Sequence, residues 1–191
     1  MDTQAASLSK DFLQQVIELT IPIDALVADC ESFLMKYKKE APADTDFSKP
    51  YSVLLTEAPD PTVSENGLVH YDELNKGGFF DRDGYAVVKK EYLTNSFKML
   101  VSSLPFQFSI MRLSVLPPTS IIFMHQDAAP HAQLAIRTNQ DCFVACRNGQ
   151  ACHVPVKGNI YVFSTTEYHT AFNASPQERV HLSISIYGSE I

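Results

Sequence analysis

The spacing of apolar residues divides the chain into two parts. In the first part, between residues 7 and 39, apolar side chains recur at the spacing of a helix face: Phe12, Val16, Ile17, Leu26, Phe33, Leu34 and Tyr37. Pro22 is suited to the start of a helix, and Asp24 would then lie in the first turn. The pattern predicts two helices, over about 8–19 and 23–39, and a third over about 85–103 that ends before Pro105.

The segments between these helices contain turns and short apolar runs. Residues 51–56 and 68–71 predict two strands, and Asn66-Gly67 predicts a turn. A glycine-rich loop that includes Gly77, Gly78 and Gly84 follows. Several aromatic residues here are candidates to close the mouth of a site, although ordinary packing is the better explanation for each: Tyr51, His70, Tyr71, Phe79 and Phe80.

In the second part, from residue 106 onward, the pattern changes to short β-rich runs separated by turns. The predicted strands are 106–116, 120–126, 131–138, 142–147, 150–154, 159–165, 168–173 and 179–187. Helices followed by many antiparallel strands indicate an α+β fold, a double-stranded β-helix (a cupin-like jelly roll) with the N-terminal helices on one outer face. We expect one domain over 1–191, with 1–105 as mainly helical support and lid or substrate loops, and 106–191 as the core.

Polar and apolar residues alternate within three of these strands. In 179–187 the odd-numbered residues from Arg179 to Ser185 are polar and their even-numbered neighbours are aliphatic. His131, Gln133 and Arg137 likewise share one face of their strand, as do Arg112 and Ser114 in theirs. A solvent-facing side would explain any single strand. Three such strands together favour a polar barrel interior that binds an anion.

His125-Gln126-Asp127 and the later His169 are the candidate metal ligands. Side chains two residues apart on a strand point the same way, and a histidine from a neighbouring strand can join them. Two imidazoles and one carboxylate leave coordination positions open, which is typical of non-haem Fe(II) oxygenases. The HxD motif alone is frequent by chance, so the surrounding motifs decide its meaning.

Five segments together resemble the aspartyl/asparaginyl β-hydroxylase family of Fe(II)- and 2-oxoglutarate-dependent oxygenases, which includes small bacterial proline-hydroxylase-like members. They are Arg112–Thr119 (RLSVLPPT), His125–Asp127 (HQD), Gly158–Phe163 (GNIYVF), His169–Asn173 (HTAFN) and Arg179–Leu182 (RVHL). The resemblance covers about residues 106–187. It implies Fe(II), 2-oxoglutarate and O2 as cofactor and co-substrates.

The resemblance also implies roles for individual residues. His125, Asp127 and His169 would be the iron ligands and catalytic residues, and Arg179 with Ser114 would bind the distal carboxylate of 2-oxoglutarate. His131 and Gln133 are further candidates for binding 2-oxoglutarate, although some members have an arginine and a histidine there. Thr119 replaces a frequent glycine. The presence of Asp127 favours hydroxylation over halogenation.

The substrate is expected to be a free amino acid or a related small carboxylate. Arg112 and Arg137 share the polar face and could clamp its carboxylate, although structural ion pairing would also explain each of them. One alternative is a hydroxylase of an Asp-, Asn- or Pro-type residue in a peptide or protein. Another, of a different class, is a cupin-like metal-binding or sensing module without catalysis.

Composition and charge indicate which partners and which cellular location to expect. The formal net charge of −7 and the lack of a basic run argue against nucleic acid or an anionic membrane as the main partner. The N-terminus has no apolar signal core, so we expect a cytoplasmic protein. The four cysteines form no CxxC pair and are expected to be reduced thiols. Asn173-Ala174-Ser175 matches a glycosylation motif, which we interpret as chance.

Overall fold

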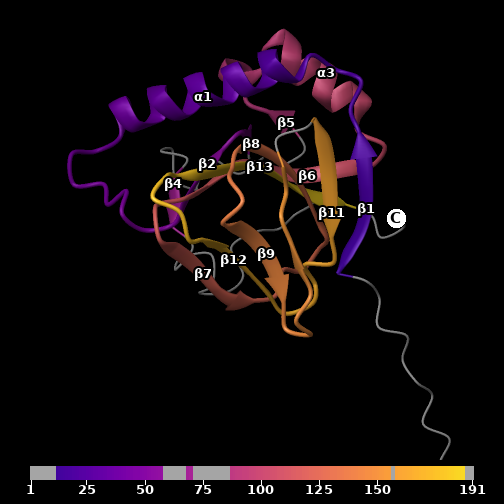
Figure 1. Cartoon of the computed structure of the whole chain (residues 1–191). Coiled ribbons are helices and arrows are strands. Elements are labelled where there is room, and N and C mark those ends of the chain that lie inside the picture. The colour runs from indigo at the N-terminus through magenta and orange to yellow at the C-terminus, as the bar shows by residue number, and fades with distance from the viewer. Residues whose placement is uncertain (1–11, 58–67, 71–86, 156–157, 188–191) are drawn as a thin grey trace, which may run out of the picture.

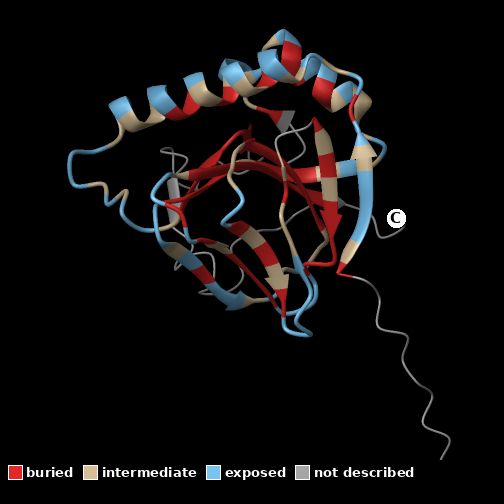
Figure 2. Ribbon diagram, viewed as in Figure 1, coloured by how far each residue is buried: buried red, intermediate tan, exposed pale blue. Residues whose placement is uncertain are grey.

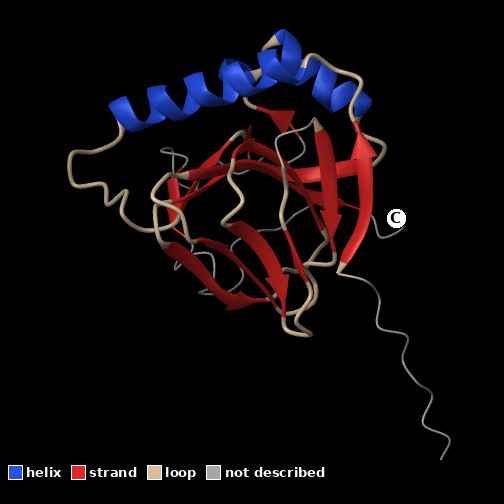
Figure 3. Ribbon diagram, in the orientation of Figure 1, coloured by secondary structure: helices blue, strands red, loops and turns tan. Residues whose placement is uncertain are grey.

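The structure is a computed structural model that describes residues 12–57, 68–70, 87–155 and 158–187. Helix α1 (Ile23–Glu40), a 3₁₀ turn η2 (Lys90–Tyr92) and helix α3 (Asn95–Ser103) accompany thirteen strands in this part of the chain. Both helices lie together on one side of the strands (Figures 1 and 3).

Two antiparallel sheets face each other beneath the helices. The larger has the order β1-β11-β8-β13-β6-β2-β4, and the smaller has the order β10-β9-β12-β7. The strands of the larger sheet are Leu13–Glu18, Asn159–Phe163, His131–Arg137, Arg179–Tyr187, Gln107–Leu116, Tyr51–Leu54 and Leu68–His70. Those of the smaller are Ala151–Cys152, Cys142–Cys146, His169–Asn173 and Ser120–His125. β3 (Thr56–Glu57) pairs with β5 (Val87–Val88). The arrangement confirms the predicted double-stranded β-helix with helices on one outer face.

The apolar face of the larger sheet forms the core beneath the helices. Leu26 and Leu34 of α1 pack in one cluster with Leu134, Leu182 and Ile184 of β8 and β13. Burial of one such side chain stabilises the fold by about 1.5–3 kcal/mol. The opposite side of α1 is largely exposed, as Figure 2 shows. The even-numbered residues of β13 therefore face the helices, and the polar odd-numbered residues face the barrel interior.

The first predicted helix, over 8–19, is wrong: its described residues form strand β1. β1 pairs with β11, with Val16 opposite Tyr161, so it completes the edge of the larger sheet. Phe12 is buried and its ring lies 5.2 Å from that of Phe163. Backbone pairing and this aromatic contact decide the conformation, because a segment this short with few apolar residues fits either period.

The two other predicted helices are present with different accuracy. α1 begins at Ile23 as expected and ends one residue later than predicted. α3 begins only at Asn95, because Thr94 caps it by accepting a hydrogen bond from the Phe97 N–H at 3.4 Å. Part of the segment predicted as the start of this helix forms β5 and η2 instead.

The proposed mouth residues do not form a described lid. Tyr51 is fully buried against Phe47, with ring centroids 5.1 Å apart, so ordinary packing explains it. The other mouth candidates, Tyr71, Phe79 and Phe80, and the side chain of His70 lie outside what the structure describes. The same holds for the predicted loop glycines Gly77, Gly78 and Gly84.

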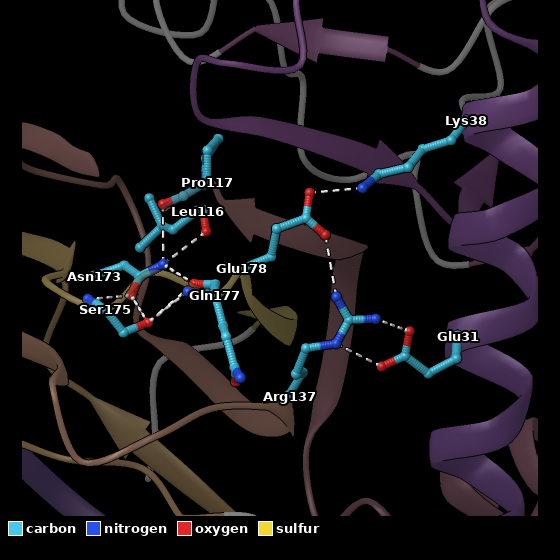
Figure 4. A network of polar contacts seen from close by, with 9 residues as sticks. All are labelled: Glu31, Lys38, Leu116, Pro117, Arg137, Asn173, Ser175, Gln177 and Glu178. Carbon is cyan, nitrogen blue, oxygen red and sulfur yellow. Dashed lines mark hydrogen bonds and ion pairs between the residues drawn. The ribbon is translucent and has the colours of Figure 1, made fainter. Parts of the chain in front are cut away.

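The eight strands predicted after residue 106 are all present, although the one predicted over 150–154 is reduced to Ala151–Cys152. All four cysteines are free thiols. Asn173 is buried, and its amide donates to the carbonyls of Leu116, Pro117 and Gln177, which ties the turn before β13 to the end of β6 (Figure 4). The described helices include none with the length and apolarity that a membrane crossing requires.

Candidate metal centre

The three predicted ligands meet at one end of the smaller sheet. His125 at the end of β7 pairs directly with His169 at the start of β12, and Asp127 follows two residues after β7. One potential ligand atom from each residue lies within 4.8 Å of the others. Asp127 Oδ2 is 3.3 Å from His169 Nε2, and Asp127 Oδ1 is 3.9 Å from His125 Nε2.

A β-bulge in β7 turns His125 toward this site. Ile122 pairs with Ala171 and His125 pairs with His169, so two residues, Phe123 and Met124, oppose a single residue of β12. With strict alternation, His125 would face away from Ile122. The additional residue restores its inward direction, and Phe123 and Met124 remain exposed at 75% and 47%.

Backbone hydrogen bonds orient both imidazoles for metal binding. His125 Nδ1 lies 2.8 Å from the carbonyl oxygen of Phe123, and His169 Nδ1 lies 3.0 Å from that of Glu167. A carbonyl only accepts, so each Nδ1 carries the proton and each Nε2 presents a lone pair. Burial lowers the pKa of His125, and His169 lowers it further, which favours the neutral ligand form.

The carboxylate of Asp127 is held ionised in the same place. Its backbone N–H donates to the Thr165 carbonyl at 2.8 Å, which fixes the loop after β7. Burial alone would raise the pKa of Asp127, but His131, His169 and Arg112 hold it well below its usual value. Two imidazole lone pairs and a carboxylate thus converge, an arrangement that a cation among them stabilises. The donor set fits Fe(II).

Most of the predicted site residues line one pocket between the two sheets. Its lining comprises Arg112, Ser114, Ile122, His125, Asp127, His131, Gln133, His169, Ala171, Arg179 and Ser183. Of the residues predicted for the site, Arg137 alone lies outside it.

Arg179 is 2% exposed, and Gln133 and His181 contact its guanidinium. Its Nη2 donates to Gln133 Oε1 at 3.1 Å and lies 2.8 Å from His181 Nδ1. Burial, with the nearby Arg179 and His153, lowers the pKa of His181 well below its usual value, so the imidazole is neutral and Nδ1 can accept. His181 was not among the predicted site residues, although alternation in β13 placed it on the pocket face.

Arg137 faces the helices instead of the pocket, so the expectation that it shares the face of Gln133 is wrong. Val180 pairs with Arg137 and His181 pairs with Ala135, which leaves Ile136 as an additional residue in β8. This β-bulge reverses the alternation at the end of the strand. Arg137 then forms ion pairs with Glu31 of α1 and, at 3.1 Å, with Glu178 (Figure 4).

Comparison with known proteins identifies a family and similar folds. A sequence model of the aspartyl/asparaginyl β-hydroxylase family matches residues 82–188. Solved structures with a similar fold include AviO1 from Streptomyces viridochromogenes Tue57, with 16% identity over 97% of this chain and 95% of that one and a TM-score of 0.55. EvdMO1 has 13% identity over 93% of this chain and 47% of that one, with a TM-score of 0.53. A prolyl-4-hydroxylase from Pseudomonas putida has a lower TM-score of 0.47, with 16% identity over 91% of this chain and 92% of that one. A search of curated protein sequences gave no match.

The family match extends over more than half of the 191 residues and contains every predicted ligand. The chain therefore belongs to the aspartyl/asparaginyl β-hydroxylase family and is a dioxygenase that uses Fe(II), 2-oxoglutarate and O2.

Proposed function

We propose that this enzyme hydroxylates an unactivated C–H bond of a free amino acid or a related small carboxylate. The observation that carries the proposal is the charge of the pocket. Two arginines, Arg112 and Arg179, line it together with one described carboxylate, that of Asp127. Arginine side chains attract carboxylates, so this lining is suited to anionic ligands, of which 2-oxoglutarate is one.

The overall reaction converts the substrate C–H, O2 and 2-oxoglutarate into the hydroxylated product, succinate and CO2. Fe(II), when bound with 2-oxoglutarate, supplies the oxidising chemistry that places one atom of O2 on the carbon. The residues of the chain hold and orient the reactants. His125, Asp127 and His169 would bind the iron, and the charge of Asp127 would offset part of the metal charge.

Arg179 and Ser114 would bind the distal carboxylate of 2-oxoglutarate. The guanidinium of Arg179 is buried, and Gln133 and His181 fix its position before any ligand arrives. Charge-assisted hydrogen bonds to a carboxylate are strong in such a buried setting. Ser114 lies on the neighbouring strand β6, opposite His181, and its side chain also lines the pocket.

Arg112 would bind the carboxylate of the substrate. It is partly exposed within the pocket, and its charge acts on both Asp127 and His125. A carboxylate bound there would lie on the iron side of the pocket, which brings the carbons next to it toward the metal. This position favours reaction close to the carboxylate end of a small molecule.

The test is anaerobic reconstitution with Fe(II), addition of 2-oxoglutarate, and then exposure to O2 with a panel of amino acids and other small carboxylic acids. We expect a visible absorption band for the Fe(II)–2-oxoglutarate complex, and succinate formation that increases with the correct substrate. Neutral analogues with the carboxylate converted to an amide serve as the matched control. Equal turnover of acid and amide would contradict the role of Arg112.

A second candidate substrate is a residue within a peptide. It is favoured by exposed apolar residues close in sequence to His125 and His169: Ile121, Phe123, Met124 and Tyr168. These residues offer more apolar contact area than a free amino acid requires. Peptides with an internal Asp, Asn or Pro belong in the same assay, and succinate formation with peptides alone would favour this candidate.

A further inference from the structure

We propose that His131 positions the carboxylate of Asp127 for iron binding and does not bind 2-oxoglutarate. The inference rests on the proposed use of the pocket as an Fe(II) site. It assigns His131 a different role from the one that the family resemblance implies, and the contacts of its two ring nitrogens carry it.

Both ring nitrogens of His131 have partners within the protein. Nδ1 lies 3.1 Å from Asp127 Oδ2, and Nε2 lies 2.8 Å from the hydroxyl of Ser185. An ionised carboxylate only accepts hydrogen bonds, so Nδ1 carries a proton and donates it to Oδ2. The Ser185 hydroxyl can rotate to complement Nε2. A ring engaged at both nitrogens has no remaining group for a co-substrate carboxylate.

The position of the His131 ring is set by regular strand pairing. His131 lies opposite Ser185 of β13 on one side and opposite Phe163 of β11 on the other. His131 and Ser185 are each 5% exposed. By contrast, Asp127 lies in the loop after β7, so its carboxylate depends on side-chain contacts for its direction. His131, which is fixed on its strand, therefore orients the carboxylate of Asp127 on the loop.

This contact determines how Asp127 can serve a metal. Oδ2 accepts from His131 and lies 3.3 Å from His169 Nε2, whereas the contact of Oδ1 with His125 Nε2 is longer, at 3.9 Å, so Oδ1 is the better candidate ligand atom. A carboxylate that uses one oxygen occupies a single coordination position and leaves more positions for 2-oxoglutarate and O2. Hydrogen bonds to ligand carboxylates commonly support metal sites in this way.

Substitution of His131 separates this role from the alternatives. His131→Phe keeps a ring of similar size without a donor, and His131→Asn keeps an amide N–H near the position of Nδ1. Ser185→Ala removes only the partner of Nε2. The matched control is His153→Phe, since His153 is a partly buried histidine that does not line the pocket.

Three quantities are measured for each variant under anaerobic conditions: the Fe(II) dissociation constant, the 2-oxoglutarate dissociation constant at saturating Fe(II), and the melting temperature of the metal-free protein. We expect His131→Phe to weaken Fe(II) binding by about 10- to 100-fold, with 2-oxoglutarate binding to the iron-loaded protein unchanged. His131→Asn should recover most of the Fe(II) affinity, and Ser185→Ala should give a smaller loss. His153→Phe should retain both dissociation constants of the unaltered protein.

Two results would overturn the proposal. If His131→Phe binds Fe(II) normally but 2-oxoglutarate weakly, His131 is a co-substrate residue. If only the melting temperature falls, its role is structural. Should His131→Phe fail to fold, His131→Asn and Ser185→Ala still test the proposal. Unchanged Fe(II) affinity in Ser185→Ala together with a large loss of Fe(II) affinity in His131→Asn would contradict it. An enzyme that binds Fe(II) but makes no succinate would refute the proposed function and leave this inference standing.

Discussion

The same strands carry two charged clusters that differ in their composition and surroundings. Inside the barrel, Arg112 and Arg179 line a pocket with the carboxylate of Asp127 and several imidazoles. Outside it, Arg137 and Lys38 pair with Glu31 and Glu178 between the sheet and α1. The outer network in Figure 4 is balanced, with two positive and two negative groups. Among the residues that the structure describes, the inner cluster holds two arginines and one carboxylate.

This difference separates a structural role from a binding role. In the outer network each charged group has an oppositely charged partner, so no ligand is required. Its contribution to stability is small because solvent screens these partly exposed ion pairs. A buried guanidinium is costly unless an anion or hydrogen-bond acceptors compensate it. In the pocket, Gln133 and His181 accept from the buried Arg179, which we propose binds an anion, whereas Glu31 and Glu178 pair with Arg137. The first three predictions alter the pocket, and the last alters the outer network.

Loss of a metal ligand should have the largest effect. His169→Ala removes one of the two imidazoles, and we expect succinate formation to fall to background and the Fe(II)–2-oxoglutarate absorption band to disappear. The measurements are succinate yield and the anaerobic visible spectrum. His153→Ala, which alters a histidine outside the pocket, should retain both. An undiminished band in His169→Ala would remove His169 from the ligand set.

Arg179→Met should come next. It removes the buried cation assigned to the distal carboxylate, and we expect 2-oxoglutarate affinity to fall by about 100-fold or more, since truncation of a buried charge partner costs about 2–5 kcal/mol. Fe(II) binding should be retained. Titration of 2-oxoglutarate into the iron-loaded variant, followed by the absorption band, measures this. Parallel loss of Fe(II) affinity would indicate a collapsed site instead of a lost carboxylate contact.

A comparison of Arg112→Met with Arg137→Met tests the clamp assignment. The first should raise the KM for a carboxylate substrate by about 10-fold, which corresponds to the roughly 1.4 kcal/mol expected for one charged hydrogen bond. The second should leave that KM unchanged, because Arg137 faces α1. Steady-state kinetics at saturating 2-oxoglutarate distinguishes them. Equal effects of the two substitutions on KM would contradict the assignment of Arg112 to the substrate carboxylate.

The smallest effect is expected from Glu178→Gln in the outer network. It weakens the ion pairs with Lys38 and Arg137 and should lower stability by about 1 kcal/mol or less. For a protein of this size, that corresponds to a decrease in melting temperature of about 2–4 °C or less, and high salt should reduce the difference. Lys49→Met, which removes an exposed ion pair with Asp46, is the control and should change little. A loss of 2-oxoglutarate affinity in Glu178→Gln would show that the two clusters are coupled.

Most of the fold and the cluster of candidate metal ligands could be predicted from the sequence because both depend on short-range regularities. Alternation in 179–187 assigned Arg179 inward and Leu182 outward, and the structure has both there. The strands after residue 106 followed from the same period. The ordered motifs around His125, Asp127 and His169 indicated the family before any geometry was known.

What the sequence by itself determined is therefore the period of each strand, the set of candidate ligands and the family. Only the tertiary structure decided how strands paired and where the period was interrupted. Residues 13–18 became a strand because the edge of β11 offered hydrogen bonds, which no local pattern encodes. One bulge turned His125 into the pocket and another turned Arg137 out of it. A single additional residue reverses the direction of every side chain beyond it, and its position depends on the partner strand.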